Sequence, residues 1–362
     1  MILVTGGTGF VGRAVVRRLR EVGHRVRVLT RRTHHGQLYQ DDSGIEICQG
    51  DVTRPETLGP ALENVDAVVH LVGIIAETWK VSFEDIHATG TINLVAAMQA
   101  AKVERLVMIS ALGTRAHAAS RYHSSKWTGE EAVRASGLDY TILRPSLIYG
   151  ARDHIIAALR TYFRPPFSWL RARLQPLPGG GQSQVQPVLV RDVAEAVARS
   201  LVTAKSLGQT YDVVGPIPIT WKQFFTTVMA GLGASLVTED LPVRTVIRVL
   251  SALLLPLVPL LVIALLALSH LHHLVFLFLL SLWIIALCVV LFSRTWVFFN
   301  VPMVILRWLS QGADHVLPRP FRFSQQVLML EEDNVGDPGP LAQDLGLVTT
   351  SFEDGLRKVL RR

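Results

Sequence analysis

Short apolar runs alternate with amphipathic stretches through the first half of the chain. The apolar runs are typical of buried strands, and the stretches between them have the periodicity of helices. Strands are predicted at Ile2–Thr5, Arg25–Thr30, Ile45–Gln49, Ala67–Leu71, Arg105–Ile109 and Tyr140–Arg144. Helices are predicted at Phe10–Glu21, Pro55–Leu62, Ser82–Ala100, Ser120–Ser136, Arg191–Thr203 and Thr220–Leu232. The alternation predicts an α/β fold, a Rossmann-type doubly wound parallel sheet with a small C-terminal lobe.

A different pattern follows, because no Asp, Glu, Lys or Arg occurs between Arg248 and Arg294. Val249–Leu268 and Leu274–Phe292 are apolar runs, and about 20 apolar residues span a hydrocarbon core. The runs predict an inserted transmembrane helical hairpin, and the alternative is a very hydrophobic pair of core helices.

The charges beside these runs predict an orientation. Arg244 and Arg248 precede the first run and Arg294 and Arg307 follow the second, whereas the connector 269–273 has no Lys or Arg. The positive-inside rule then predicts a multi-pass protein of the cell (inner) membrane with its nucleotide-binding domain facing the cytoplasm. We expect four parts: a Rossmann core (1–150), the end of the core with a substrate lobe (151–245), the hairpin (246–293), and an interfacial segment with the C-terminal lobe (294–362).

Composition narrows the class of protein. Charged residues make up 18% of the chain and hydrophobic residues 49%, which excludes a disordered protein. The formal net charge is +7, and a basic balance is compatible with nucleic acid, anionic lipid or anionic cofactors. The two cysteines, Cys48 and Cys288, exclude a disulfide framework and favour a reducing compartment.

A glycine-rich turn follows the first predicted strand and opens the first helix. Gly6, Gly9 and Gly12 have the spacing G-x-x-G-x-x-G, and Phe10 and Val11 lie between the last two. Such a turn lets backbone N–H groups approach a pyrophosphate at a helix N-terminus. The sequence therefore predicts binding of a nicotinamide dinucleotide.

The ends of the next three strands supply further cofactor contacts. No acid follows the second strand, where Arg31 and Arg32 are placed to pair with a 2′-phosphate, so NADP(H) is favoured over NAD(H). The remaining predicted contacts are Asp51 and Val52 after the third strand, and Leu71, Val72 and Gly73 after the fourth.

A candidate proton-transfer set follows. Ser110 ends the fifth predicted strand, and Tyr122 and Lys126 share one face of the next helix because they are four residues apart. A nearby ammonium and a cationic nicotinamide lower the pKa of a phenol, so Tyr122 is the predicted acid/base, Lys126 its partner and Ser110 the substrate anchor. Tyr122 and Lys126 are also predicted cofactor contacts, and no metal is predicted.

These residues resemble the extended and atypical branches of the short-chain dehydrogenase/reductase superfamily. The resemblance rests on the segments 5–12 and 143–150 (LRPSLIYG), together with Ser110, Tyr122 and Lys126. The segments 186–194 (QPVLVRDVA), 211–216 (YDVVGP) and 326–334 (QVLMLEEDN) narrow the resemblance to bacterial relatives of the 39 kDa nucleotide-binding accessory subunit of respiratory complex I. The resemblance covers about 1–240 and 320–362.

The resemblance implies bound NADP(H) and leaves three functions open. The first, which the proton-transfer set and the predicted membrane location favour, is a membrane-anchored NAD(P)-dependent oxidoreductase acting on a lipophilic, quinone- or isoprenoid-like substrate. The second is a non-catalytic accessory, assembly or redox-sensing protein of a respiratory complex, with respiratory subunits as partners and NADP(H) as a structural ligand. The third is a sugar-nucleotide epimerase-like enzyme.

Three other clusters are assigned no chemistry. His270, His272 and His273 read as the polar cap of the hairpin rather than a metal site. The arginines and aromatic residues of 160–173 fit contact with the lipid bilayer better than with nucleic acid, which is not expected as a partner. Gln182, Gln184 and Gln186 line the substrate cleft or satisfy loop backbone.

Overall fold

The computed structural model describes residues 1–32, 37–151, 174–232, 236–237, 296–316 and 324–361. The chain divides into two compact units. The first contains Met1–Asp153, Gln182–Trp221 and Met303–Arg362, and the second contains His154–Gly181 and Lys222–Pro302. All predicted site residues belong to the first unit.

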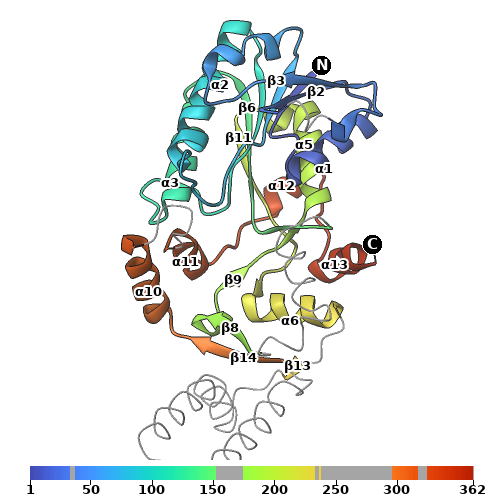
Figure 1. The fold of residues 1–362 in the computed structure, drawn as a ribbon. Coiled ribbons are helices and arrows are strands. Elements are labelled where there is room, and N and C mark those ends of the chain that lie inside the picture. The colour runs from blue at the N-terminus through green and yellow to red at the C-terminus, as the bar shows by residue number, and fades with distance from the viewer. Residues whose placement is uncertain (33–36, 152–173, 233–235, 238–295, 317–323, 362) are drawn as a thin grey trace, which may run out of the picture. The chain divides into compact units, whose positions relative to one another are not determined.

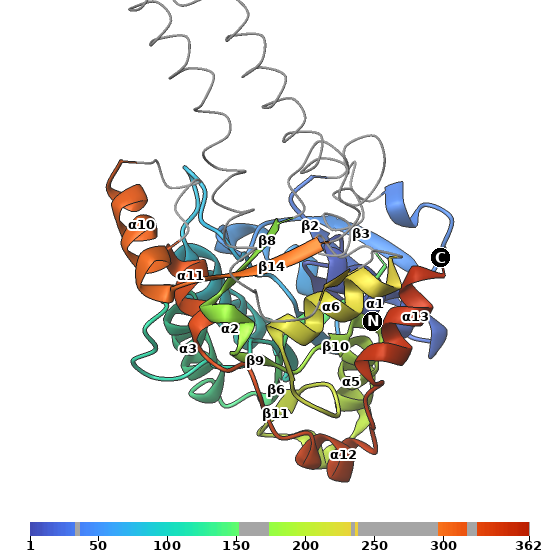
Figure 2. The ribbon, with the colours of Figure 1, turned by 90° about the horizontal axis from the view of Figure 1, so that it is seen from below.

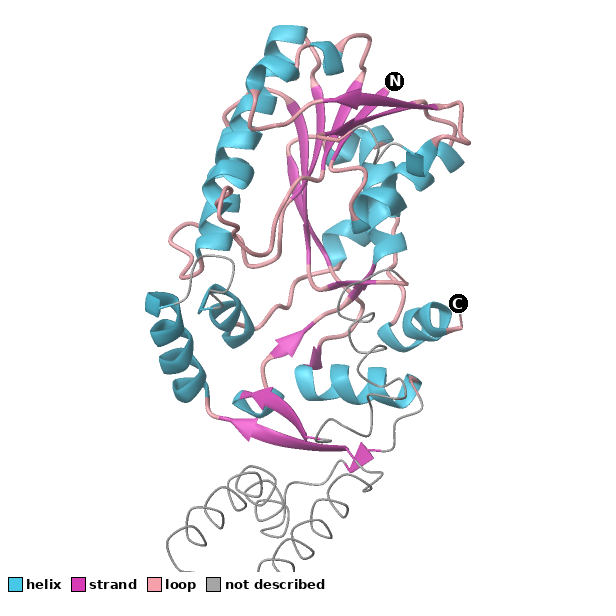
Figure 3. Ribbon diagram, in the orientation of Figure 1, coloured by secondary structure: helices cyan, strands magenta, loops and turns pink. Residues whose placement is uncertain are grey.

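A seven-stranded parallel sheet forms the centre of the first unit (Figures 1 and 3). In spatial order its strands are β11 (Gln209–Val213), β6 (Asp139–Pro145), β5 (Arg105–Ile109), β4 (Ala67–His70), β1 (Ile2–Thr5), β2 (Val26–Thr30) and β3 (Ile45–Gln49). The order reverses between β1 and β4, and ligands of such sheets bind at the carboxyl edge beside that point. The prediction of a Rossmann-like parallel sheet is confirmed; β11 was not predicted.

Helices cover both faces of this sheet (Figure 1). One face carries α1 (Phe10–Glu21) and α5 (Val190–Val202), and the other carries α2 (Gly90–Ala101) and α3 (Arg121–Arg134). A further helix, α12 (Gly339–Leu345), lies beside β11 and α5 (Figures 1 and 2).

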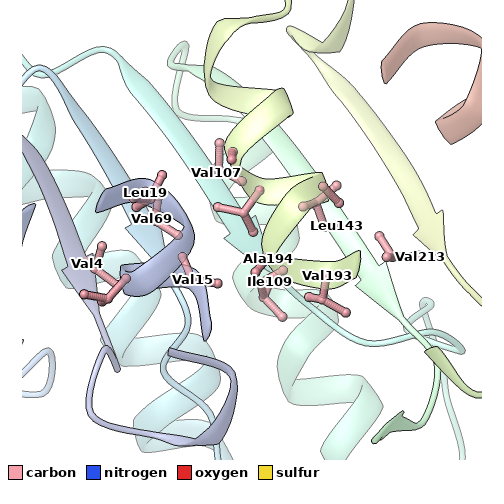
Figure 4. Packing of buried hydrophobic residues seen from close by; sticks show 14 of the residues in the cluster. Val4, Val15, Leu19, Val69, Val107, Ile109, Leu143, Val193, Ala194 and Val213 are labelled. Carbon is pink, nitrogen blue, oxygen red and sulfur yellow. The ribbon is translucent and has the colours of Figure 1, made fainter. Parts of the chain in front are cut away.

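Successive strand residues point to opposite faces, which divides the core into two clusters. Val4 packs beneath α1 and α5, where Val15, Leu19 and Val193 join it (Figure 4). Leu3 faces the other way, into the cluster beneath α2. A strand buried on both sides requires continuous apolar sequence, which is the pattern that identified these strands.

Two predicted helices have a different local structure. The segment 55–62 forms two 3₁₀ turns, Pro55–Thr57 and Pro60–Leu62, because Pro60 has no N–H to continue a helix begun at Pro55. The single helix predicted over 82–100 begins with a π-helical turn, Glu84–Thr89 (η4), before α2. Such turns in α-helices are frequent at functional sites.

The remaining elements of the first unit lie between residues 148 and 360. Two short strand pairs join β7 (Ile148–Tyr149) to β10 (Val188–Leu189) and β9 (Gln184–Val185) to β12 (Ile219–Thr220). The other elements are η6 (Ala204–Ser206), α10 (Met303–Val316), α11 (Ser324–Glu331) and α13 (Phe352–Leu360).

The second unit contains a small parallel sheet. Its order is β13 (Leu236–Val237), β14 (Trp296–Val301) and β8 (Leu174–Pro178), and β8 leads into the turn Gly179–Gly181 (η5). Helix α6 (Trp221–Gly231) begins at its boundary with the first unit. In the part predicted as an interfacial segment with the C-terminal lobe (294–362), the first described elements are strand β14 and helix α10.

The structure contradicts the predicted membrane location. Within the described ranges, no helix combines the length and the apolar character needed to cross a bilayer. The two runs that suggested the hairpin, 249–268 and 274–292, lie outside the described residues, as do His270, His272, His273, Cys288 and 160–173. Hydropathy and flanking arginines suggested the hairpin, but neither property determines whether a segment forms a helix that spans a membrane.

Candidate functional site

Most of the predicted site residues lie at one edge of the large sheet because they follow the carboxyl ends of parallel strands, whereas Tyr122 and Lys126 lie on α3. Gly6 follows β1, Arg31 follows β2 and Asp51 follows β3 within two residues. Leu71 follows β4 and Ser110 follows β5. This is the edge at which the strand order reverses between β1 and β4.

The glycine-rich turn has the backbone geometry that close approach of a ligand requires. Gly6 has φ +74°, in the left-handed region, and a Cβ there would lie 3.0 Å from the carbonyl carbon of Leu71. A Cβ at Gly12 would lie 2.2 Å from the carbonyl oxygen of Gly6, so α1 can start against the turn only with glycine. Gly9 is the N-cap and has no side-chain cap, and no acid occupies the first turn of α1, which begins with Phe10 and Val11. These features fit a pyrophosphate at the N-terminus of α1.

Tyr39 supports this turn and was missed by the sequence analysis. Its hydroxyl donates to the carbonyl oxygen of Gly7 at 2.7 Å, and burial raises the pKa of Tyr39 to about 12. Arg13 adds a second tie through Nε, which donates to the carbonyl oxygen of Thr8 at 2.9 Å. The Tyr39 contact joins residues 32 positions apart, so the glycine motif gives no sign of it.

The end of β2 is electropositive. Arg31 and Arg32 are exposed, and neither guanidinium has a hydrogen-bond or ion-pair partner among the described residues. Thr30 fixes the turn, because its hydroxyl donates to the carbonyl oxygen of Arg32 at 3.2 Å. The two side chains are thus available to an anion.

The segment after β3 is fixed by hydrogen bonds. One carboxylate oxygen of Asp51 accepts from the N–H of Thr53 at 3.0 Å and from its hydroxyl at 2.9 Å. Val52 is buried, and its carbonyl oxygen accepts from the Asn93 side chain at 3.0 Å. The Asp51 carboxylate therefore keeps a defined position.

The strand-end segment after β4 approaches the glycine turn at one end and Lys126 at the other. A Cβ at Gly6 would lie 3.1 Å from the backbone nitrogen of Val72, and one at Gly73 would lie 3.4 Å from Lys126 Nζ. Residues 71–73 therefore connect the glycine turn with the Tyr122–Lys126 pair.

Tyr122 and Lys126 are buried side by side on α3. Lys126 Nζ lies 5.7 Å from the centroid of the Tyr122 ring, and Tyr122 packs against Ala111 and Phe83. Ser110 is buried at the end of β5, next to Ala111, and its hydroxyl donates to Thr114 Oγ1 at 3.4 Å. The structure thus brings Tyr122 and Lys126 together and gives Ser110 a separate hydrogen-bond partner.

Burial dominates the ionisation of this pair. It raises the pKa of Tyr122, opposite to the expected lowering, and Lys126 Nζ faces the ring of Tyr122, 5.7 Å from its centroid. Burial lowers the pKa of Lys126 to about 8, although Glu130 on the next turn of α3 acts in the opposite direction. The lysine is 5% exposed, and no hydrogen bond of its ammonium joins it to another described residue. A buried ammonium of this kind fits the hydroxyl groups of a nucleotide ribose.

His87 was missed by the sequence analysis and holds Tyr122 from the side. It lies in the π-helical turn, and its ring meets the Tyr122 ring edge-on with centroids 5.3 Å apart. Ser125 Oγ donates to the carbonyl oxygen of Tyr122 at 2.9 Å, so it accepts from His87 Nδ1, also at 2.9 Å. His87 Nε2 then accepts the N–H of Ile74 at 3.1 Å, and burial lowers the pKa of His87 to about 2. His87 is a neutral bridge between residue 74 and α3.

A second buried histidine links the strands to α2. Thr91 donates its hydroxyl hydrogen to the carbonyl oxygen of His87 at 2.7 Å, so it accepts from His70 Nε2 at 3.2 Å. Thr5 in turn donates to His70 Nδ1 at 2.7 Å. Burial lowers the pKa of His70 to about 3. A histidine in an apolar run gives no sequence signal that distinguishes this structural role.

Glu130 fixes the C-terminal part of α3. It is fully buried and accepts from Arg134 at 2.6 Å and from Arg144 Nε at 2.9 Å. Both guanidinium groups also face the ring of Trp127, at 4.9 Å and 6.0 Å. This network ties α3 to β6 directly behind Lys126.

The C-terminal segment borders the site, which the sequence alone did not predict. Glu332 forms a bidentate ion pair with Arg115, at 2.9 Å and 2.8 Å. Gln325 Oε1 accepts the first N–H of α3, from Arg121, at 2.8 Å. Gln186 donates to the carbonyl oxygen of Gly215 at 2.5 Å and accepts from Gly336 at 3.1 Å, so it satisfies loop backbone.

Comparison with known proteins identifies relatives of this architecture. A family model described as NAD(P)H-binding matches residues 6–156. The NADH dehydrogenase [ubiquinone] 1 alpha subcomplex subunit 9 of Arabidopsis thaliana is 31% identical over 220 residues, 59% of this chain and 53% of that protein. A ceramide reductase of Caulobacter vibrioides is 34% identical over 153 residues, 42% of this chain and 48% of that protein. The chain spans about half the length of these curated relatives.

Solved structures share the fold at lower identity. An NADPH-dependent quinone oxidoreductase from Escherichia coli, solved with NADPH, has a TM-score of 0.64 and 16% identity and covers 99% of both chains. Such a likeness establishes the fold alone. Taken with the glycine turn and the order of the parallel strands, the comparisons show that the chain has an NAD(P)-binding domain of the Rossmann type that resembles the short-chain dehydrogenases/reductases, with complex I subunits and reductases among its relatives.

Proposed function

We propose that this protein is an NAD(P)-dependent oxidoreductase that interconverts a carbonyl and an alcohol on a lipophilic substrate. The observation that carries the proposal is the buried Tyr122–Lys126 pair at the sheet edge beside the glycine turn. Enzymes place groups of perturbed pKa where proton transfer is needed. The ceramide reductase relative supports this class of reaction by its name.

Each residue has a distinct part in the proposed mechanism. A bound reduced nicotinamide would supply the hydride to the carbonyl carbon. Tyr122 donates its phenolic proton to the carbonyl oxygen, and solvent returns a proton to the phenolate. Lys126, mostly an ammonium at pH 7 because its pKa is about 8, favours that phenolate. Ser110 holds the substrate oxygen.

The surroundings of Tyr122 support a lipophilic substrate. Phe83 and Ala111 are buried against it, and Ile74 and Met329 pack on the same cluster. An apolar wall stabilises an alkyl chain by removing its surface from water.

We propose NADP(H) as the cofactor because Arg31 and Arg32 are unpaired at the end of β2. Changing both to alanine is expected to weaken NADPH binding by about 10–100-fold and NADH binding by less than about threefold, since a charge-assisted hydrogen bond contributes about 1.5–3 kcal/mol. Titration of each nucleotide measures this. Arg17→Ala, on the exposed surface of α1, is the matched control. Equal losses for the two nucleotides would contradict the assignment.

The proposed function is tested with the purified full chain and two probes. We expect oxidation of NADPH when methyl octyl ketone or menadione is added, with a rate that depends on Tyr122. A nucleotide that stays bound and unchanged with both probes, in wild type and Tyr122→Phe alike, would contradict the proposal.

A second candidate is an accessory protein of a respiratory complex with a structural nucleotide. The relative from Arabidopsis thaliana, a complex I subunit by name, favours it. This function predicts co-purification with respiratory subunits and no effect of Tyr122→Phe on growth that depends on respiration.

A further inference from the structure

Two buried polar atoms near Tyr122 have no hydrogen-bond partner among the described residues. They are Ser120 Oγ and Gln326 Oε1. Ser120 is 3% exposed and is the N-cap of α3, yet its side chain makes no capping hydrogen bond. Burying such atoms without a hydrogen bond costs free energy, so a hydrogen bond from each atom to a bound molecule would be favourable.

Both atoms belong to segments that border the apolar cluster around Tyr122. Ser120 lies two residues before Tyr122. Gln326 lies on α11, three residues before Met329, and residues three apart share a helix face. Met329 packs on the Tyr122 cluster with Ile74, and Gln326 Nε2 donates to the carbonyl oxygen of the adjacent Ile75 at 3.0 Å.

The contacts of Gln326 show which of its side-chain atoms lacks a hydrogen-bond partner. Its Nε2 is engaged with Ile75, so the unpaired atom is the oxygen, which only accepts. A partner must therefore donate, as a hydroxyl or an amide N–H does. Ser120 Oγ can donate or accept, so it suits the same partner.

The arginines nearest to Ser120 in the sequence do not favour an anionic partner. Arg115 is paired with Glu332, and Arg121 is paired with Glu77 and Glu84. The two guanidinium groups of these loops are therefore already neutralised by carboxylates. A carboxylate beside the reacting carbonyl would meet the acceptor of Gln326 without a donor of its own.

We propose that Gln326 and Ser120 bind a neutral hydrogen-bond donor, a hydroxyl or amide N–H, that the substrate carries beside the carbonyl served by Tyr122. This inference rests on the proposed oxidoreductase function and narrows its substrate class. The substrate is then a lipophilic ketone with an adjacent neutral polar group, and simple ketones and oxo acids are poorer substrates.

The test compares kcat/KM for three probes with the same tail: methyl, hydroxymethyl and carboxymethyl octyl ketone. We expect wild type to prefer the hydroxymethyl probe to the methyl probe by about 10–100-fold and to turn over the carboxymethyl probe least. Ser120→Ala and Gln326→Leu each lower the hydroxymethyl-to-methyl ratio by about tenfold and change the methyl rate by less than about twofold.

Gln325→Leu is the matched control, because it makes the same change one residue away on the same helix. It removes the cap on Arg121, so it is expected to change the three rates by the same factor. Ser120→Ala is not expected to disturb folding, because it removes a single oxygen that has no hydrogen-bond partner among the described residues.

The outcomes separate the two proposals. A ratio that neither variant changes, or a wild-type preference for the carboxymethyl probe, overturns the inference and leaves the oxidoreductase function standing. Absence of turnover with all three probes overturns the oxidoreductase function, and the inference with it.

Discussion

Replacing Tyr122 with phenylalanine is expected to lower kcat by about 10²–10⁴-fold, because the ring stays and only the proton donor is lost. The ring contacts with Phe83 and His87, at centroid distances of 5.8 Å and 5.3 Å, do not involve the hydroxyl. The affinity for NADPH should therefore change by less than about threefold. Steady-state rates and nucleotide titration measure the two effects.

The matched control is Tyr140→Phe on β6, which removes a phenol outside the site. It should leave kcat within about twofold of wild type. A Tyr122→Phe variant that keeps a third or more of wild-type kcat would eliminate Tyr122 as the acid/base.

Replacing Lys126 with methionine is expected to have opposite effects on activity and stability. Activity falls by about 10²-fold or more, since the group that favours the Tyr122 phenolate is lost. Stability rises at pH 7, because the lysine is charged and buried with a pKa lowered from 10.5 to about 8. That shift corresponds to roughly 3 kcal/mol of the free energy of unfolding, and methionine removes it with little change in volume.

The pH dependence identifies the cause of the stability change. Between pH 8 and 10.5 the unfolded chain binds more protons at Lys126 than the folded chain does, so wild-type stability rises with pH there. The advantage of Lys126→Met is therefore full below pH 8 and disappears above 10.5. Thermal unfolding at several pH values measures it, and an advantage that does not depend on pH would refute burial of the charge as its source.

The sequence predicted the sheet well because its signals are local. Buried parallel strands are continuous apolar runs, and six of the seven were predicted to within a residue or so. Strand β11 was missed because Gln209, Thr210 and Asp212 interrupt its apolar pattern, as an edge strand permits. The glycine turn and the Tyr122–Lys126 spacing were likewise readable from adjacent residues.

What the sequence did not predict depends on contacts between distant segments. The pairing of Arg115 with Glu332 joins residues 217 positions apart, and periodicity does not report such contacts. The same holds for His87, whose part depends on a π-helical turn and on Ser125. The rise in the Tyr122 pKa also required the packed structure, because it comes from burial.

Transfer of hydride from bound NADPH to a ketone is the most direct test of the proposed oxidoreductase function. Protein loaded with NADPH carrying deuterium at the transferred position is mixed with hydroxymethyl octyl ketone, and the product is analysed by mass spectrometry. We expect wild type to give a diol with one deuterium on the former carbonyl carbon, and Tyr122→Phe to lower the product yield about 10²-fold or more in the same time. Labelled nucleotide that remains bound and reduced, with no deuterated alcohol from wild type, would contradict it.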